Sequence, residues 1–150
     1  MKNSIIKFFA GAAMLLSSPT WADDLVGTWQ QIDDKTGSPK ALIEISKTDN
    51  GTYSGKIVKV TPRVGYTPQE KCIKCPPPYK DQPILGLEVF TGLKEIKENV
   101  YANGKVLDPL SGSIYNMKGK LAINKKRLHL RGYIGISAIG RTQIWIRQEP

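Results

Sequence analysis

Two cysteines, Cys72 and Cys75, are the residues whose type and spacing most directly suggest chemistry. A C-x-x-C pair can be a redox centre, half of a metal site or a disulfide that clips a loop. A redox centre of the thioredoxin kind needs the pair at the start of a helix, which lowers the thiolate pKa. Here three prolines, residues 76–78, follow at once and argue against a helix. A zinc site needs four ligands, and the cysteines with the single histidine, His129, fall short.

The N-terminus indicates the compartment that decides between these alternatives. Residues 1–22 have the layout of a secretory signal peptide, with two lysines, an apolar run to about Leu16 and a cleavage site after Ala22. The apolar run is too short for a transmembrane anchor. We therefore expect an exported mature domain, residues 23–150, that is periplasmic or secreted. An oxidising compartment favours a disulfide between the two cysteines, and no metal site is predicted.

The composition narrows the classes of partner and of activity. The chain has 22 Lys and Arg against 13 Asp and Glu, a formal net charge of +9. Such a balance suits nucleic acid, an anionic surface or a small anionic ligand, and it also suits ordinary solubility. The only run of basic residues is Lys125–Arg127, and no nucleic-acid-binding motif is present, so no nucleic-acid partner is predicted. The sequence has one histidine and no G-x-S-x-G motif, and we read Asp33 and Asp34 as turn residues. We predict no catalytic residue and no cofactor, and the protein partner stays open.

Most of the mature sequence has the pattern of short strands separated by turns. Apolar residues alternate with polar ones, as in Ala41, Ile43 and Ile45, and turn signals recur about every ten residues. Asn50–Gly51 and Asn103–Gly104 are hairpin signals. No segment is convincing as an amphipathic helix. The pattern predicts one all-β domain of about eight antiparallel strands, either a sandwich or an up-and-down barrel.

One segment does not follow this pattern. Residues 62–83 contain six prolines, one glycine and both cysteines, without periodicity. A connection this long in a small domain is commonly a lid or a binding loop. The expected disulfide would clip its middle.

Several motifs carry a resemblance to known barrels. Gly27-Thr28-Trp29, in the first expected strand, resembles the G-x-W signature of lipocalin-type barrels. In those folds the Trp closes one end of the barrel, and a basic side chain from near the C-terminal strand packs across its ring. The resemblance implies this role for Arg141 or Arg147, in a cation–π contact worth up to about 2 kcal/mol.

The wider set of motifs is more specific. "QPILG" after the cysteines, the turn "LDPLSGSIY" and the closing "RGYIG…GRTQIWIR" complete the set. Together they resemble a family of small exported bacterial proteins known as a domain of unknown function, related to the lipocalin and calycin barrels. The resemblance covers essentially the whole mature chain and implies a lipocalin-like (calycin-type) barrel of eight strands, without an established activity. The sequence departs from true lipocalins in having no convincing helix after the last strand.

The last two expected strands raise the question of a binding site, because each has one polar and one apolar face. If the polar faces of both strands point inward, the lumen suits a ligand with an anionic head and an apolar body, because Arg supplies paired donors to a carboxylate. If the Leu and Ile faces form the core, the same polar residues face water. A mixed arrangement, with Arg141 partly buried on Trp29, is a third possibility. The candidate binding residues are Arg131, Tyr133, Arg141, Gln143 and Tyr115.

Two functions from different classes remain open. The first is a non-catalytic, exported barrel that binds a small amphiphile or a lipid-like anion. The second is an envelope or secreted interaction or structural protein with a filled barrel, which would bind a partner through its basic surface and residues 62–83. An eight-stranded barrel is just wide enough for either interior.

Overall fold

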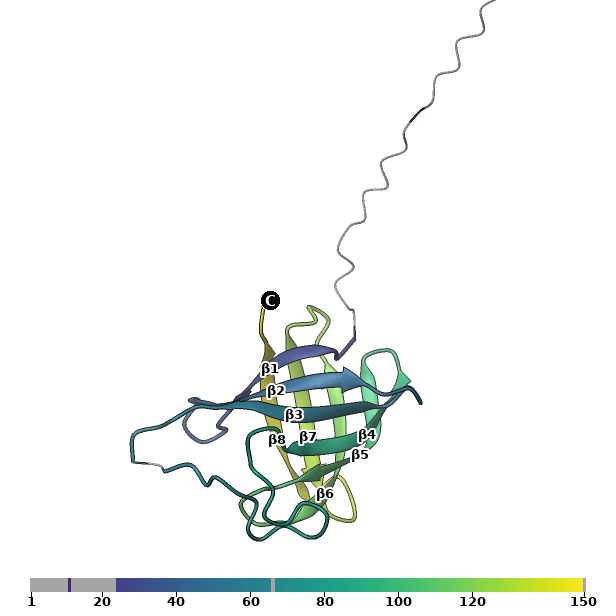
Figure 1. Cartoon of the computed structure of the whole chain (residues 1–150). Coiled ribbons are helices and arrows are strands. Elements are labelled where there is room, and N and C mark those ends of the chain that lie inside the picture. Colours follow the sequence, from purple (N-terminus) through teal and green to yellow (C-terminus); the bar gives the residue numbers. More distant parts are fainter. Residues whose placement is uncertain (1–10, 12–23, 66, 150) are drawn as a thin grey trace, which may run out of the picture.

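The protein folds as a closed barrel of eight antiparallel strands (Figure 1). The computed structural model describes residue 11, residues 24–65 and residues 67–149. Each strand pairs with the next along the chain, and the first strand pairs with the last. The strands are β1 (Gly27–Ile32), β2 (Pro39–Lys47), β3 (Tyr53–Val60), β4 (Glu88–Lys97), β5 (Val100–Leu107), β6 (Ile114–Leu121), β7 (Arg127–Tyr133) and β8 (Gly140–Arg147). The predicted all-β antiparallel barrel is confirmed. The predicted signal peptide, residues 1–22, lies outside the described residues except for Gly11.

The alternation of apolar and polar residues in the sequence corresponds to the alternation of inward and outward side chains in the barrel wall. On β2, Ala41, Ile43 and Ile45 are buried, while Glu44 between them is exposed. Successive side chains of a strand point to opposite faces, so one set fills the barrel and the other meets solvent. Gly55 on β3 is a necessary exception, because a Cβ there would lie 2.2 Å from the ring of Phe90. The absent side chain makes room for that ring inside the barrel.

The hairpin predicted at Asn103–Gly104 is wrong. β5 runs straight through this pair, and its pairing with β6 shifts register between Tyr101 and Gly104. Asn103 has a φ of 66°. The left-handed conformation that Asn tolerates in a hairpin turn also suits an irregularity within a strand. The turn between β4 and β5 lies instead at residues 98–99.

The two ends of the barrel are built differently. At the closed end lie the tight turns 48–52, 98–99 and 122–126 and both ends of the continuous described chain (Figure 1). At the open end lie the connections 33–38, 61–87, 108–113 and 134–139. We keep the names "closed end" and "open end" below. The side chains that fill the closed end are large and buried: Leu25, Trp29, Tyr53, Tyr101, Leu121 and Leu128.

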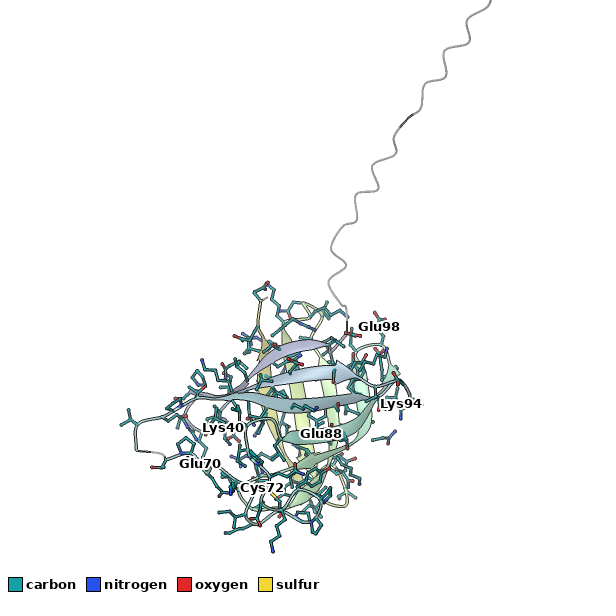
Figure 2. All side chains as sticks on the ribbon, viewed as in Figure 1. Lys40, Glu70, Cys72, Glu88, Lys94 and Glu98 are labelled. Carbon is teal, nitrogen blue, oxygen red and sulfur yellow. A yellow bond between two sulfur atoms is a disulfide. The ribbon has the colours of Figure 1, made fainter. Side chains whose placement is uncertain are left out.

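The long connection between β3 and β4 carries the predicted disulfide, which is confirmed. Cys72 and Cys75 are bonded, with their Cα atoms 5.4 Å apart. The Cys72 amide donates to the Gln82 carbonyl at 2.8 Å, so the two halves of the connection are joined. Gly112 is in tight contact with this clip, because a Cβ there would meet the Lys74 carbonyl. The clip thus packs on the β5–β6 connection at the open end, and Figure 2 shows Cys72 away from Glu98 of the closed end.

Candidate functional site

The barrel encloses a cavity of about 530 Å³ that is lined by residues of the open end and of the barrel wall. Binding sites for small molecules commonly have 300–1,000 Å³ of space and mainly apolar walls. The cavity has this character, because the alternating inward positions of most strands are aliphatic. Its apolar wall consists of Ala41, Ile43, Ile57, Val60, Ile84, Val89, Val106, Leu107, Met117, Leu130 and Trp145.

The aromatic residue Trp145 lies between the cavity and the closed end. Its ring is 4% exposed and lies 6.1 Å from that of Phe90, at a tilt of 53°. Phe90 is the ring for which Gly55 makes room. The aromatic pair therefore separates the space of the cavity from the densely packed closed end.

A pair of amides forms a polar band on one side of the cavity. Gln31 and Gln143 both line it, from β1 and β8. The Gln143 Oε1 atom accepts hydrogen bonds from Gln31 Nε2 at 3.0 Å and from Trp145 Nε1 at 3.2 Å. These two bonds fix the orientation of the Gln143 amide. Its Nε2 group is then available to donate to a polar group of a ligand.

Two carboxylate–guanidinium pairs cross the rim of the cavity. Arg63 donates to Asp33 at 2.9 Å, and Arg141 donates to both oxygens of Asp34, with Nη2 2.7 Å from Oδ1. The Arg141 hydrogen bond is the main reason that the pKa of Asp34 lies below its ordinary value. The pKa of Asp33 is also lowered, first by the backbone amides of Thr36 and Lys35 and then by Arg63.

These pairs attach the β1–β2 turn to two distant parts of the open end. The Arg141 and Asp34 side chains are 58% and 27% exposed, so water and salt weaken their attraction. Their role is to position the rim more than to stabilise the barrel. Sequence analysis missed both pairs, because it read the two aspartates only as turn residues.

The structure separates the five candidate binding residues. Four of them, Tyr115, Tyr133, Arg141 and Gln143, line the cavity, and the Tyr133 ring also lies 6.0 Å from Lys118 Nζ. Arg131 does not line the cavity. It donates hydrogen bonds to the Ser137 and Ala138 carbonyls and to Thr142 Oγ1.

Of the alternatives left open for β7 and β8, the one in which both polar faces point inward does not hold for β7. The register pairs Leu130 with Gln143 and Gly132 with Arg141. Residues paired directly across two strands lie on the same face of the sheet. The inward face thus combines the leucine face of β7 with the polar face of β8, and Arg131 lies on the outer surface.

The closed end contains the arrangement that the G-x-W motif implied. Trp29 is fully buried, and the guanidinium carbon of Arg147 lies 4.3 Å from the centre of its ring. Arg147 also donates to the carbonyls of Lys125, Val26 and Asp24. Burial lowers the pKa of Arg147. Of the two arginines considered for this role, Arg147 takes it, and Arg141 lies at the opposite end of the barrel.

Two further observations concern other classes of site. Within residues 24–65 and 67–149, no three His, Cys, Asp or Glu side chains form a group that could hold a metal ion. Within the described residues, no helix is long and apolar enough to cross a membrane.

An eight-stranded antiparallel barrel with a Trp–Arg plug at one end and an apolar cavity toward the other is a lipocalin-like barrel. Residues 27–147 match the profile of a family described as "Uncharacterized protein conserved in bacteria (DUF2147)", and the chain belongs to this family. Among solved structures it is similar to protein HP1028 from the human pathogen Helicobacter pylori, which is described as belonging to the lipocalin family. The similarity has a TM-score of 0.70 at 17% sequence identity and covers 84% of each chain. At this identity the similarity shows the fold. A comparison with curated proteins found no significant match.

Proposed function

We propose that this protein is an exported, non-catalytic barrel that binds a small amphiphile in its cavity. A lipocalin-like barrel suggests binding of a small ligand. The observation that carries the proposal is the cavity of about 530 Å³ with an almost continuous apolar wall. Burying an apolar chain against such a wall is favourable by about 25 cal/mol for each Å² removed from water. The expected signal peptide, residues 1–22, supports the exported location.

The positions of the polar groups suggest how the ligand would be oriented. The charged side chains that line the cavity lie at or next to the open end, and the wall beyond them is mostly aliphatic and aromatic. They are Lys40, Arg63, Asp108 and Arg141. An amphiphile would therefore place its apolar body in the barrel and its head group at the rim. Gln143 would donate one hydrogen bond to the ligand at a depth between the charged rim and the apolar wall.

An anionic head group fits the rim if it shares Arg141 with Asp34. The Nε and Nη2 atoms of Arg141 are engaged by this carboxylate. Because the pair is largely exposed, water can replace either partner, and a ligand carboxylate could do the same. The head group therefore gains less binding free energy than it would between two arginines, because Arg131 lies on the outer surface of the barrel. We therefore expect an anion to be preferred over a neutral analogue by a modest factor.

A filled barrel that serves only as an interaction module is the competing function. It would need side chains that occupy the interior along its whole length. The closed end satisfies this requirement, but the cavity toward the open end does not. The interior thus favours the binding function.

The test is a calorimetric titration with a C16 carboxylic acid and with the alcohol of the same length. We expect both to bind, and the acid to bind about two- to fivefold more tightly, because the charge at the rim is solvent-exposed. Arg141→Gln should remove most of this preference. Arg127→Gln, which removes an exposed charge on the outer face of β7, is the matched control and should change nothing. If neither compound binds, the proposal fails. Equal affinities for acid and alcohol would refute only the preference for an anionic head group and would leave the binding of an amphiphile standing.

A further inference from the structure

The connection between β7 and β8 presents an unusual apolar surface. We call residues 134–139 the β7–β8 tip; its sequence is Ile-Gly-Ile-Ser-Ala-Ile, without a charged residue. Ile134, Ile136 and Ile139 are 64%, 63% and 67% exposed. Single exposed apolar residues are common on protein surfaces, but a contiguous group marks a contact site. The grouping of these three isoleucines in one short connection therefore marks a candidate contact site.

Hydrogen bonds hold the tip in this exposed arrangement. The Ile139 amide donates to the Ile136 carbonyl at 3.0 Å, and the Ile134 amide donates to the Ile139 carbonyl at 3.3 Å. Arg131 Nε donates to the Ser137 carbonyl at 2.6 Å. The guanidinium thus lies directly behind the isoleucines. A positive charge is fixed at the base of an apolar projection.

The strands that lead to the tip form a surface with one sign of charge. We call the outward residues Lys105, Lys118, Lys120, Arg127 and Arg131 of β5–β7 the basic wall. Between Val100 and Arg147 the only acidic residue of the sequence is Asp108, which lies in the β5–β6 connection. On the opposite wall, Lys56 pairs in register with Glu44 on one side and Glu88 on the other. The two walls therefore differ in that β2–β4 also carry Glu44, Glu88 and Glu95, whereas β5–β7 carry no acidic residue.

We propose that the β7–β8 tip and the basic wall together dock the β5–β7 side of the barrel on the surface of an anionic phospholipid bilayer, with the tip inserted at the open-end edge of that side. The isoleucines would enter the boundary between head groups and acyl chains, and the lysines and arginines would contact lipid phosphates. Burial of apolar side chains and attraction to anionic lipids are the two contributions that bind proteins to membrane interfaces. Tyr133, at the junction of tip and wall, is of a residue type enriched at this level of a membrane.

A bilayer fits this surface better than a folded protein does. A stable protein interface buries about 800 Å² on each partner. A projection of six residues is small for that, while a bilayer accepts a small apolar insertion without a complementary shape. In addition, Ile134 and Ile139 line the cavity. An amphiphile that leaves the barrel at this rim would meet the acyl boundary of the bilayer directly.

The first experiment measures binding of the purified protein to vesicles by co-sedimentation, on phosphatidylglycerol–phosphatidylcholine mixtures and on phosphatidylcholine alone. Ile136→Ser should lower the partition coefficient on anionic vesicles at least fivefold, because it removes one inserted side chain without changing the cavity lining. Ile123→Ser is the matched control. Ile123 is 94% exposed in the β6–β7 turn at the closed end, and its loss should change the coefficient less than twofold. Thermal melts establish that both variants fold.

The second experiment separates local charge from net charge. Lys118→Gln with Lys120→Gln should weaken binding to anionic vesicles about tenfold or more, since each lysine near such a surface contributes about 1 kcal/mol, or about fivefold. Lys56→Gln with Lys59→Gln removes the same charge from the opposite wall and should have a small effect. Equal losses from both pairs would show non-specific attraction and would overturn the proposal. It would also be overturned if Ile136→Ser bound to anionic vesicles like the parent protein. The same holds if the protein did not bind vesicles and these residues instead mediated self-association or binding to an acidic protein.

Discussion

The closed and open ends of this barrel are made by the same alternation of residues, but they serve different purposes. At the closed end the inward residues are large, and Arg147 satisfies three backbone carbonyls while it covers Trp29. Toward the open end the inward residues are mostly aliphatic and leave a cavity, and two ion pairs, of which Arg141–Asp34 is the more exposed, hold the rim. The difference indicates that stability is concentrated at one end, so that the other can keep empty space and solvated charge. Four predictions test this division.

The largest effect is expected at the plug. Trp29→Ala should lower the free energy of unfolding by about 3–5 kcal/mol, because it removes a fully buried ring from a close-packed site. Trp145→Ala removes the same side chain from the cavity wall, where the ring already borders open space. It should cost less stability and affect ligand binding more. Urea denaturation of both variants gives the comparison, and equal losses would contradict a stability concentrated at the closed end.

The two arginines provide a second matched pair. Arg147→Gln removes charged hydrogen bonds and the contact with Trp29, and it should destabilise the protein by about 2–3 kcal/mol. Arg141→Gln breaks only an exposed pair and should leave the denaturation midpoint nearly unchanged. A midpoint that responds more to Arg141→Gln than to Arg147→Gln would reverse the assignment of the two ends.

High pH should affect the closed end. Burial, followed by the nearby Asp24 carboxylate, raises the pKa of Tyr53 to about 12, and burial with Glu95 also raises the pKa of Tyr101. Because the folded state favours the protonated phenols, their contribution to stability is complete below about pH 10 and is lost as the pH rises through about 12. Absorbance titration should show these tyrosines ionising late. Tyr53→Phe should remove one late step, and its persistence in the variant would refute the assignment.

Low pH should affect the open end, with the smallest effect. The pKa values of Asp33 and Asp34 are lowered in the folded protein. The contribution of the two carboxylates to stability is therefore present above their ordinary pKa of 3.8 and is lost as the pH falls below it. NMR titration should find both groups ionising below that value. In Arg141→Gln only Asp34 should shift back, and an unchanged Asp34 would show that another group lowers its pKa.

The sequence allowed the strands to be predicted because period-two alternation and turn residues are local signals. The disulfide was also predictable, since its two residues are close in sequence and the following prolines exclude a redox helix. Which face of each strand points into the barrel was not predictable from the sequence. The register of β7 against β8 decides this, and it places Gln143 inward and Arg131 outward. The rim pairs join residues 30 and 107 positions apart, and no local pattern links them. The Asn103–Gly104 signal was read as a hairpin because bulges and turns favour the same backbone conformation.

The location of both chain ends has a practical consequence. Asp24 and Arg147 are in contact through the Asp24 carbonyl, so the described chain begins and finishes on the same side of the molecule (Figure 1). An affinity tag, a fused reporter or a linker to a solid support added at either end of the described domain would extend from that side. In each case the entrance to the cavity would point away from the attachment. Immobilised protein should consequently be as accessible to ligand as protein free in solution, whichever end of the described domain is used.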